Sequence, residues 1–167
     1  MKLVIASILI SISFMGVSQT IVLDSNETSY FESIGFELDS TSNYKLFSFV
    51  CQWTETPYLY AGKSLKGIDC SSFVKALYKE VYNLQLTGTS SSLPSECSPI
   101  EKSQLEQGDL IFFKIYGTKI SHVAVYLGGN KFVHASTKLG VTISDLSEAY
   151  YTQRYFSAGR VTILVDR

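Results

Sequence analysis

The sequence predicts an α+β domain in which N-terminal helices pack on a curved antiparallel sheet of about five strands. Two stretches in the first half of the chain carry apolar residues at helical spacing, and the second half consists of short alternating apolar runs. Most of these runs are joined by only a few residues, which favours antiparallel neighbours over parallel crossovers. Because helices come first and strands follow, the two kinds of element are segregated along the chain, as in α+β proteins.

Length and composition are those of one globular domain with a sizeable core. The chain has 167 residues, of which 46% are hydrophobic and 17% charged, so it carries too much apolar surface to remain unfolded. A formal net charge of −1 provides no positive field for nucleic acid, and we expect no nucleic-acid partner. Cys51, Cys70 and Cys97 are too few for a disulfide scaffold and include no close pair of the kind that structural zinc sites use. A Cys51–Cys97 disulfide and two free thiols are both compatible with the sequence.

Residues 1–18 are predicted to be a signal peptide. Lys2 is followed by an uncharged apolar run that ends in the small residues Gly16 and Ser18. The uncharged stretch 3–23 is also long enough for an uncleaved membrane anchor, but its four serines and its small end favour cleavage. We therefore expect an exported protein of the periplasm, cell envelope or extracellular space, with no integral membrane span after cleavage.

Residues 19–42 are predicted to be a polar arm or linker, and residues 43–167 the folded domain. The arm is rich in Ser, Thr, Asp, Asn and Glu and shows no sustained period. Its aromatic residues Tyr30, Phe31 and Phe36 are able to pack it on the domain.

Two helices are expected at the start of the domain, over about residues 43–53 and about residues 71–82. Asp69 stands where the N-cap of the second helix belongs, and Pro57 lies where the first helix has ended. Each helix carries an apolar stripe, formed by Leu46, Val50 and Trp53 in the first and by Phe73, Leu77 and Val81 in the second.

The rest of the chain consists of a surface loop and five strand candidates. Residues 87–98 are rich in Ser and Thr and contain a proline, which predicts the loop. Apolar and polar residues then alternate in short runs separated by glycine or polar residues. The strand candidates cover residues 109–115, 120–127, 131–137, 140–146 and 155–164.

Cys70 is the candidate nucleophile because it lies at the predicted start of the second helix. The unpaired N–H groups and the positive end of the helix dipole stabilise a thiolate at such a position. A buried, unreactive cysteine is the alternative. A nucleophilic thiol needs a base, and the chain contains two histidines, His122 and His134.

The pairing register of the two histidine-bearing strands decides whether both imidazoles reach one site. If Leu127 pairs with Lys131 across a three-residue loop, His134 lies opposite Ala124, on the same face as His122. A two-residue turn shifts the pairing by one and puts the histidines on opposite faces. Glycine and asparagine in the loop suit a three-residue connection with positive φ, so we expect one shared face.

A histidine pair beside a thiol has two chemical interpretations besides that of two ordinary strand histidines. One ring acts as the base for Cys70 while the other orients it. Alternatively, Cys70, His122 and His134 bind zinc with water as the fourth ligand, although the local spacing typical of zinc sites is missing.

Several separated motifs resemble the NlpC/P60 family of cell-wall peptidases, over about residues 43–164. Residues 56–60 and 154–161 also resemble its pattern. The motifs that carry the resemblance are Gly67–Phe73, Gly108–Phe113, Ser121–Tyr126 and Lys131–Ser136.

The resemblance implies a papain-like fold and a secreted cysteine peptidase that hydrolyses peptide bonds of peptidoglycan stem peptides. The bond is typically that between γ-D-glutamyl and the diamino acid, and no cofactor or metal is needed. Cys70 matches the nucleophile, His122 the general base and His134 the orienting third residue of a Cys-His-His triad. Tyr58 matches a tyrosine that lines the site and helps to hold the oxyanion.

Asp69 and Ser71 match positions that contact substrate in the family, and Asp69 is able to serve both as helix cap and as ligand of a substrate amine. Two positions depart from the family pattern. Ser72 stands where the family usually has glycine, and Thr87-Gly88 stands where it has a Pro-Arg pair. The second change removes a cation from the loop that borders the groove.

Two other functions are compatible with the same residues. One is a cell-wall-binding module of the same fold with impaired catalysis, and the other is an acyltransferase that uses the same thiol. The three intact residues of the triad weigh against the binding module. The oligomeric state and the preferred diamino acid are left open by the sequence.

Overall fold

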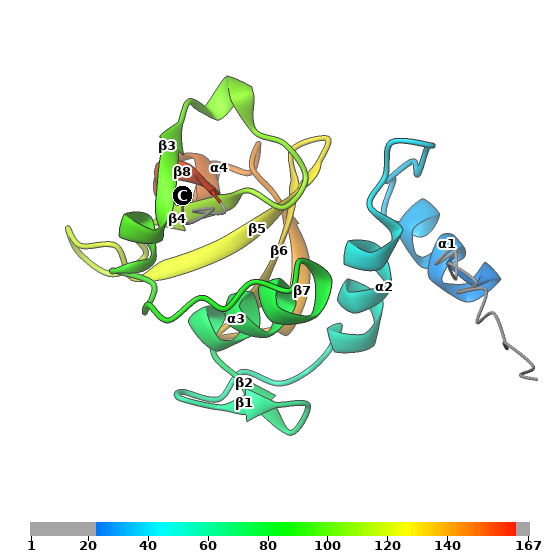
Figure 1. Cartoon of the computed structure of the whole chain (residues 1–167), viewed down its shortest axis with the longest axis horizontal. Helices are drawn as coiled ribbons and strands as arrows, with labels where there is room; N and C mark the ends of the chain where they lie inside the picture. Colours follow the sequence, from blue (N-terminus) through cyan, green and yellow to red (C-terminus); the bar gives the residue numbers. More distant parts are fainter. Residues whose placement is uncertain (1–22, 163–167) are drawn as a thin grey trace, which may run out of the picture.

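The computed structural model describes residues 23–162 and has the three longer helices on one side of an antiparallel sheet and a short one on the other (Figure 1). The helices are α1 (Ser25–Ser33), α2 (Tyr44–Trp53), α3 (Cys70–Val81) and α4 (Ala149–Thr152), with 3-10 turns at Leu93–Glu96 and Lys102–Gln104. The strands are β1 (Lys63–Ser64), β2 (Gly67–Ile68), β3 (Cys97–Ile100), β4 (Leu110–Phe113), β5 (His122–Gly128), β6 (Lys131–Ser136), β7 (Gly140–Asp145) and β8 (Tyr155–Val161).

The main sheet has six strands in the order β3-β8-β4-β5-β6-β7, one more than the sequence predicted. Strands β4 to β7 form the predicted antiparallel meander, and β8 returns to pair with the free side of β4. The added strand, β3, begins in the last two residues of the expected loop 87–98 and pairs with β8. Pro99 is tolerated there because β3 is an edge strand, and a side chain at Gly159 would collide with Cys97.

Helices α2 and α3 begin and end within a residue or two of their predicted bounds, and a side-chain N-cap fixes the start of each. The Asn43 side chain accepts from the Leu46 N–H at 3.1 Å, and the Asp69 side chain accepts from the Ser72 N–H at 2.7 Å. The inner face of α3 packs on β5 and β6, and α2 packs against α3. Figure 1 shows α1 on the far side of α2 from the sheet.

The α1 helix was not expected, since residues 19–42 were predicted to be an irregular polar arm. Asp24 and Glu27 form a capping box that begins the helix. Phe31 is fully buried and packs edge-on against Phe36 and Phe47, at ring-centroid distances of 6.0 Å and 4.9 Å. Aromatic residues that were expected to pack the arm on the domain thus attach this segment to it. The domain boundary at residue 42 stays a prediction.

The predicted signal peptide, residues 1–18, lies outside the described residues. Within residues 23–162, no helix combines the length and the apolar character that a membrane span requires.

The turn between β5 and β6 differs from the expected three-residue loop but gives the expected register. Gly129 and Asn130 form a two-residue turn with φ of +55° and +64°, closed by the pair Gly128 and Lys131. A register shift between Tyr126 and Gly128 then accommodates one extra residue. Beyond this bulge Val125 pairs with Val133, which places the two histidines on one face, as predicted.

The two faces of the sheet are buried in different apolar clusters. Val123, Val125 and Val133 belong to the cluster that the helices cover. The opposite face carries the cluster of Phe113, Phe132 and other residues, with Tyr151 of α4 packed against it. Because side chains alternate along a strand, His122 and His134 lie on the Phe132 side.

The turn between β6 and β7 is held against the segment that follows α2. The Val141 N–H donates to the Thr56 carbonyl at 2.8 Å, and the Glu55 N–H donates to the Val141 carbonyl at 2.9 Å. Gly140 has a φ of +74°, and a Cβ at this position would collide with the Thr56 carbonyl oxygen. Glycine is therefore required here for both conformation and space.

We expect Gly140→Ala to lower the free energy of unfolding by about 3 kcal/mol or more, because strain at positive φ adds to a backbone collision. Gly35→Ala is the matched control, since Gly35 has a similar φ of +70° with no atom near the Cβ position. That change should cost about 1 kcal/mol. Urea unfolding of both variants measures the difference, and equal losses would contradict the role assigned to the Thr56 contact.

Candidate active site

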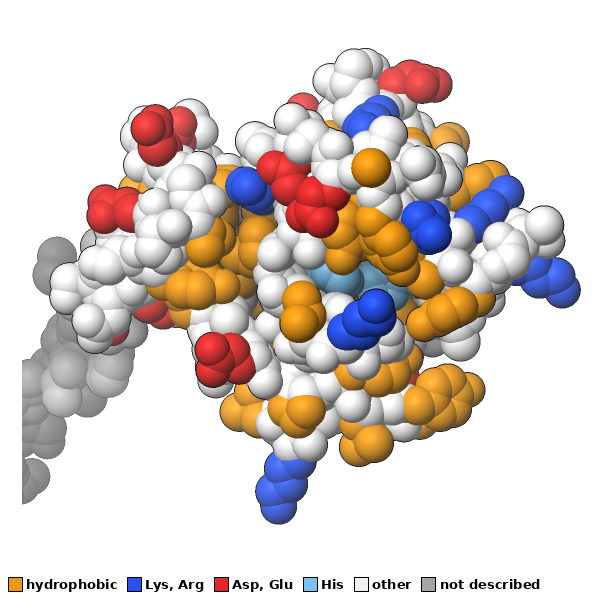
Figure 2. All heavy atoms as spheres, turned by 180° about the vertical axis from the view of Figure 1, so that it is seen from behind, with side chains coloured by type: hydrophobic (Ala, Val, Ile, Leu, Met, Phe, Trp, Pro, Cys, Tyr) orange, Lys and Arg blue, Asp and Glu red, His pale blue; other side chains and the backbone are white. Residues whose placement is uncertain are grey.

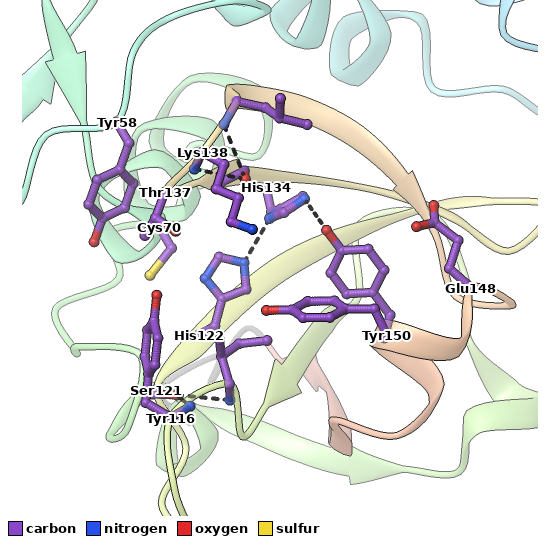
Figure 3. Close-up of a pocket in the computed structure, with 14 residues that line it drawn as sticks. Tyr58, Cys70, Tyr116, Ser121, His122, His134, Thr137, Lys138, Glu148 and Tyr150 are labelled. Carbon is purple, nitrogen blue, oxygen red and sulfur yellow. Dashed lines mark hydrogen bonds between the residues drawn. The ribbon is translucent and has the colours of Figure 1, made fainter.

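Cys70, His122 and His134 lie in one cleft of about 390 Å³ (Figure 3). Tyr58 lines the cleft beside Cys70, and the tyrosines of α4 line its other end. Figure 2 shows the histidines at the bottom of a hollow with apolar side chains around its rim. The cleft thus brings together four of the six residues that the sequence singled out.

The two imidazoles are joined directly. His122 Nε2 lies 2.8 Å from His134 Nδ1, and the rings are nearly perpendicular. His134 Nε2 lies 3.1 Å from Ser144 Oγ and 3.3 Å from the Tyr151 hydroxyl. In Figure 3 the other nitrogen of His122, Nδ1, is on the side of the ring that faces the Cys70 sulfur.

Burial keeps both imidazoles neutral. His122 and His134 are only 8% and 3% exposed. Loss of solvation lowers the pKa of His122 to about 4 and also lowers the pKa of His134, which is further lowered by the neighbouring His122. At neutral pH the pair is therefore uncharged, as a base that accepts a proton must be.

Cys70 is the first residue of α3, as the sequence predicted, but its surroundings do not favour a standing thiolate. Burial raises the pKa of the Cys70 thiol, and the Asp69 carboxylate adds to this effect. The backbone N–H groups of Val123, Ser71 and Cys70 itself act in the opposite direction. Burial outweighs the helix-start effect that the sequence suggested, so the sulfur holds its proton at rest.

Asp69 and Ser71 stand at the start of α3 but do not line the cleft. One oxygen of the Asp69 carboxylate accepts from the Ser72 N–H and the Ser71 hydroxyl, and the other accepts from the Ala61 N–H at 3.0 Å. The helix-cap role of Asp69 is thus confirmed. Contact of either residue with substrate stays a prediction.

Tyr58 is half-buried and follows the segment that Gly140 holds in place. Residues 58 and 68 form an isolated parallel bridge, which fixes the backbone of Tyr58 near the start of α3. Burial raises the pKa of the Tyr58 hydroxyl, so it keeps its proton and is able to donate a hydrogen bond.

The histidine geometry does not suit a zinc ion shared by the pair. Tetrahedral zinc ligands that lie about 2.0–2.1 Å from the ion are about 3.3 Å from each other. The two nitrogens, at 2.8 Å, are closer than this and are placed to hydrogen-bond to each other instead. Within residues 23–162, no cluster of three or more histidine, cysteine or acidic side chains is arranged to hold a metal. Cys51, Cys70 and Cys97 are all free thiols.

The two departures from the family pattern are accommodated locally. Ser72 is buried, and its N–H is the group that Asp69 caps. In the loop at Thr87-Gly88, the Glu96 carboxylate accepts from both backbone N–H groups. An acidic side chain thus orders this loop, where the family has a cation.

The cleft also contains residues that the sequence did not indicate. Lys138 and Leu139 come from the β6–β7 turn, and Tyr116 comes from the loop between β4 and β5. Tyr150 and Tyr151 come from α4, a short helix between two predicted strands. Two adjacent tyrosines in an otherwise polar connection were the sequence signal for a functional role. No local pattern indicated that their side chains would line the cleft.

Fold and cleft together define an α+β protein that presents a helix-borne thiol to a pair of strand-borne imidazoles. The chain belongs to the NlpC/P60 family, whose sequence profile matches residues 55–160. The papain-like α+β fold expected from the sequence motifs is that of the NlpC/P60 domains.

Two curated relatives illustrate the similarity. The chain is 36% identical over 138 residues to the probable endopeptidase NlpC homolog of Haemophilus influenzae, covering 81% of this chain and 73% of that protein. It is 36% identical over 131 residues to murein DD-endopeptidase MepS/murein LD-carboxypeptidase of Escherichia coli K12, covering 78% and 68%.

Solved structures share the fold. An NlpC/P60 family protein from Bacillus cereus is 27% identical with a TM-score of 0.65, covering 75% of this chain and 42% of that one. The chain thus spans less than half the length of that protein. RipD from Mycobacterium tuberculosis, described as a non-catalytic NlpC/p60 domain protein adapted to peptidoglycan binding, has a TM-score of 0.59 at 19% identity, covering 72% of this chain and 97% of RipD.

The neutral buried histidines make stability depend on pH. A folded-state pKa of about 4 for His122 lies below the value of about 6.5 for an exposed imidazole, so the unfolded chain binds more protons in that range. We therefore expect the free energy of unfolding to fall as the pH drops from about 6.5 toward about 4, with His122 alone contributing about 2 kcal/mol by pH 5.

Urea unfolding at a series of pH values measures this loss. His122→Gln, which is neutral at every pH, is the control and should show a weaker dependence. An identical pH dependence in the parent protein and in this variant would contradict the assignment.

Proposed function

We propose that this protein is an exported cysteine peptidase that hydrolyses peptide bonds in peptidoglycan stem peptides through a Cys70-His122-His134 triad. The observation that carries the proposal is the short contact between two buried neutral imidazoles in the cleft that also holds Cys70. Membership of the NlpC/P60 family and relatives named as endopeptidases support the reaction class. The predicted signal peptide and an envelope substrate support export.

The proposed reaction is acyl transfer to the thiol followed by hydrolysis. His122 Nδ1 takes the thiol proton while the Cys70 sulfur attacks the amide carbon, and the same proton then passes to the leaving amine. Because the resting thiol is protonated, proton transfer accompanies attack. Water then hydrolyses the thioester, with His122 again acting as the base.

The developing oxyanion has two candidate donors, the Cys70 backbone N–H and the Tyr58 hydroxyl. The first-turn N–H groups of a helix lack intrahelical acceptors, so that of Cys70 has no acceptor within α3 and lies beside the sulfur, where the oxyanion forms. Each donor of this kind contributes about 3–4 kcal/mol to transition-state stabilisation in enzymes where one has been removed.

The bond that we propose is the one between γ-D-glutamyl and the diamino acid, as the family resemblance implies. The relative MepS is named for DD-endopeptidase and LD-carboxypeptidase activities, so other bonds are the direct alternatives. Mass spectrometry of digests of defined stem peptides and cross-linked dimers identifies the bond. A transfer product in place of a free amine would indicate an acyltransferase.

We expect Cys70→Ala and His122→Ala each to reduce cleavage of a purified muropeptide by at least about a thousandfold, because each removes a reacting group. Cys51→Ala is the matched control: this thiol lies on α2, outside the cleft, and its loss should leave turnover near that of the parent. Mass spectrometry of timed digests measures the rates.

Near-normal turnover in the Cys70→Ala protein would refute the mechanism. Binding of muropeptide without any cleavage by the parent protein would favour the binding module, a function that the RipD description attaches to the same fold.

Lys138 gives the cleft its positive charge, since among the described lining residues it is the one lysine or arginine. Stem peptides carry free carboxylates, which such a cation attracts. We expect Lys138→Met to raise KM about threefold to tenfold for a peptide with a free carboxylate beside the scissile bond. The increase should be smaller for the amidated peptide.

Lys45→Met, on the exposed side of α2, removes the same charge away from the cleft and is the control. An equal rise in KM for both peptides, or for both variants, would show that Lys138 does not recognise a substrate carboxylate.

A further inference from the structure

Three polar atoms meet on the side of His134 that faces away from His122. Ser144 Oγ on β7 and the Tyr151 hydroxyl on α4 both lie within hydrogen-bonding distance of His134 Nε2. Ser144 Oγ in turn donates to the Tyr151 hydroxyl oxygen at 3.2 Å. Figure 3 shows His134 bonded on both sides, to His122 and to a tyrosine hydroxyl.

The hydrogens in this group can be counted. A serine hydroxyl has one hydrogen, and that of Ser144 is directed to Tyr151. Ser144 is then able only to accept from His134, so a hydrogen bond at their 3.1 Å contact requires the hydrogen to be on His134 Nε2. The Tyr151 oxygen, which is more distant at 3.3 Å, is then a second acceptor of this N–H and directs its own hydrogen elsewhere. A neutral imidazole carries one N–H, which leaves His134 Nδ1 as an acceptor.

The count continues to the thiol. Since His134 Nδ1 accepts, His122 Nε2 must donate across the 2.8 Å contact. The single N–H of neutral His122 is thereby used, and His122 Nδ1 has a free lone pair on the side that faces Cys70. With the opposite orientation of these bonds, His122 Nδ1 would carry a hydrogen and would be unable to take one from sulfur.

We propose that Ser144 and Tyr151 are positioning residues that set the tautomers of both histidines and so keep His122 Nδ1 unprotonated toward the Cys70 thiol. This inference rests on the proposed peptidase function only for its effect on turnover. The hydrogen arrangement itself is a property of the resting protein.

Packing holds the two hydroxyls where this role requires them. The Tyr151 ring lies edge-on to Phe132 at 4.9 Å and to Phe113 at 5.7 Å, and its face is nearly perpendicular to the His134 ring. Ser144 is paired in register with Phe132. His134 is 3% exposed, so water has little access to replace either oxygen.

The first test is a measurement of the tautomers in the full chain labelled with ¹⁵N-histidine. Long-range ¹H–¹⁵N spectra distinguish an Nε2–H from an Nδ1–H imidazole. We expect Nε2–H for His134 in the parent protein. Tyr151→Phe frees the Ser144 hydrogen to turn toward His134 Nε2, and Ser144→Ala allows the Tyr151 hydroxyl to do the same, so both variants should gain Nδ1–H tautomer.

The second test is steady-state cleavage of a muropeptide by the same proteins. Each substitution should lower kcat about tenfold, because the active tautomer loses the stabilisation of roughly one hydrogen bond. KM should change less than about twofold. Tyr155→Phe is the matched control, because it removes a hydroxyl from the same aromatic cluster outside the cleft. It should change neither kcat nor the His134 spectrum.

A fall in kcat together with the tautomer change supports the proposal. A fall in kcat with an unchanged His134 tautomer, or a tautomer change with unchanged kcat, overturns it. Tyr151→Phe keeps the ring contacts and gives a result even where Ser144→Ala does not fold. If the parent cleaves nothing, the peptidase function fails, whereas a parent His134 with Nδ1–H refutes the tautomer assignment independently.

Discussion

The pairing register between β5 and β6 is the constraint on which the site depends. Side chains alternate between the faces of a strand, so a slip of one residue would turn one imidazole away from the other. The bulge before Gly128 absorbs the extra residue of the turn and preserves the pairing of Val125 with Val133. That same pairing directs valines toward α3 and histidines toward the cleft. The strand pairing that buries the valines in the core therefore also brings the two histidines together.

Burial explains the chemical character of the site. Three titratable groups are brought out of water, and in each case the uncharged form is favoured: the thiol of Cys70 keeps its proton, and neither imidazole gains one. The acceptors beyond His134 are hydroxyls of Ser144 and Tyr151, which carry no charge. The site is thus a chain of hydrogen bonds between uncharged groups. The fold determines which group donates and which accepts in each bond, and it places no charged group in the chain.

The sequence predicted those parts of the protein that depend on local patterns. The helix cap at Asp69, alternation along the meander and the shared face of the histidines all arise from residues close together in the chain. Strand β3 was missed because its pairing partner, β8, lies some sixty residues further on. The α1 helix was missed because a polar surface dominates its sequence, while Phe31 finds its partners only in the fold. The roles of Lys138 and Tyr151 depend on which loops meet over the cleft, which no local pattern records.

The contact of Gly140 with Thr56 makes one wall of the cleft inseparable from the sheet. Tyr58 follows Thr56 by two residues, and the backbone around Thr56 is hydrogen-bonded to Val141 of β7. Displacing that wall would mean breaking a sheet edge, so it behaves as part of the rigid frame. The opposite side consists of the single turn of α4, which is bonded to β7 through Ser144 and Tyr151, and the loop that carries Tyr116 between β4 and β5. Divergence of substrate preference among related proteins is therefore easiest in the Tyr116 loop, where Tyr116 is exposed and residues can be exchanged without disturbing the thiol or the rings.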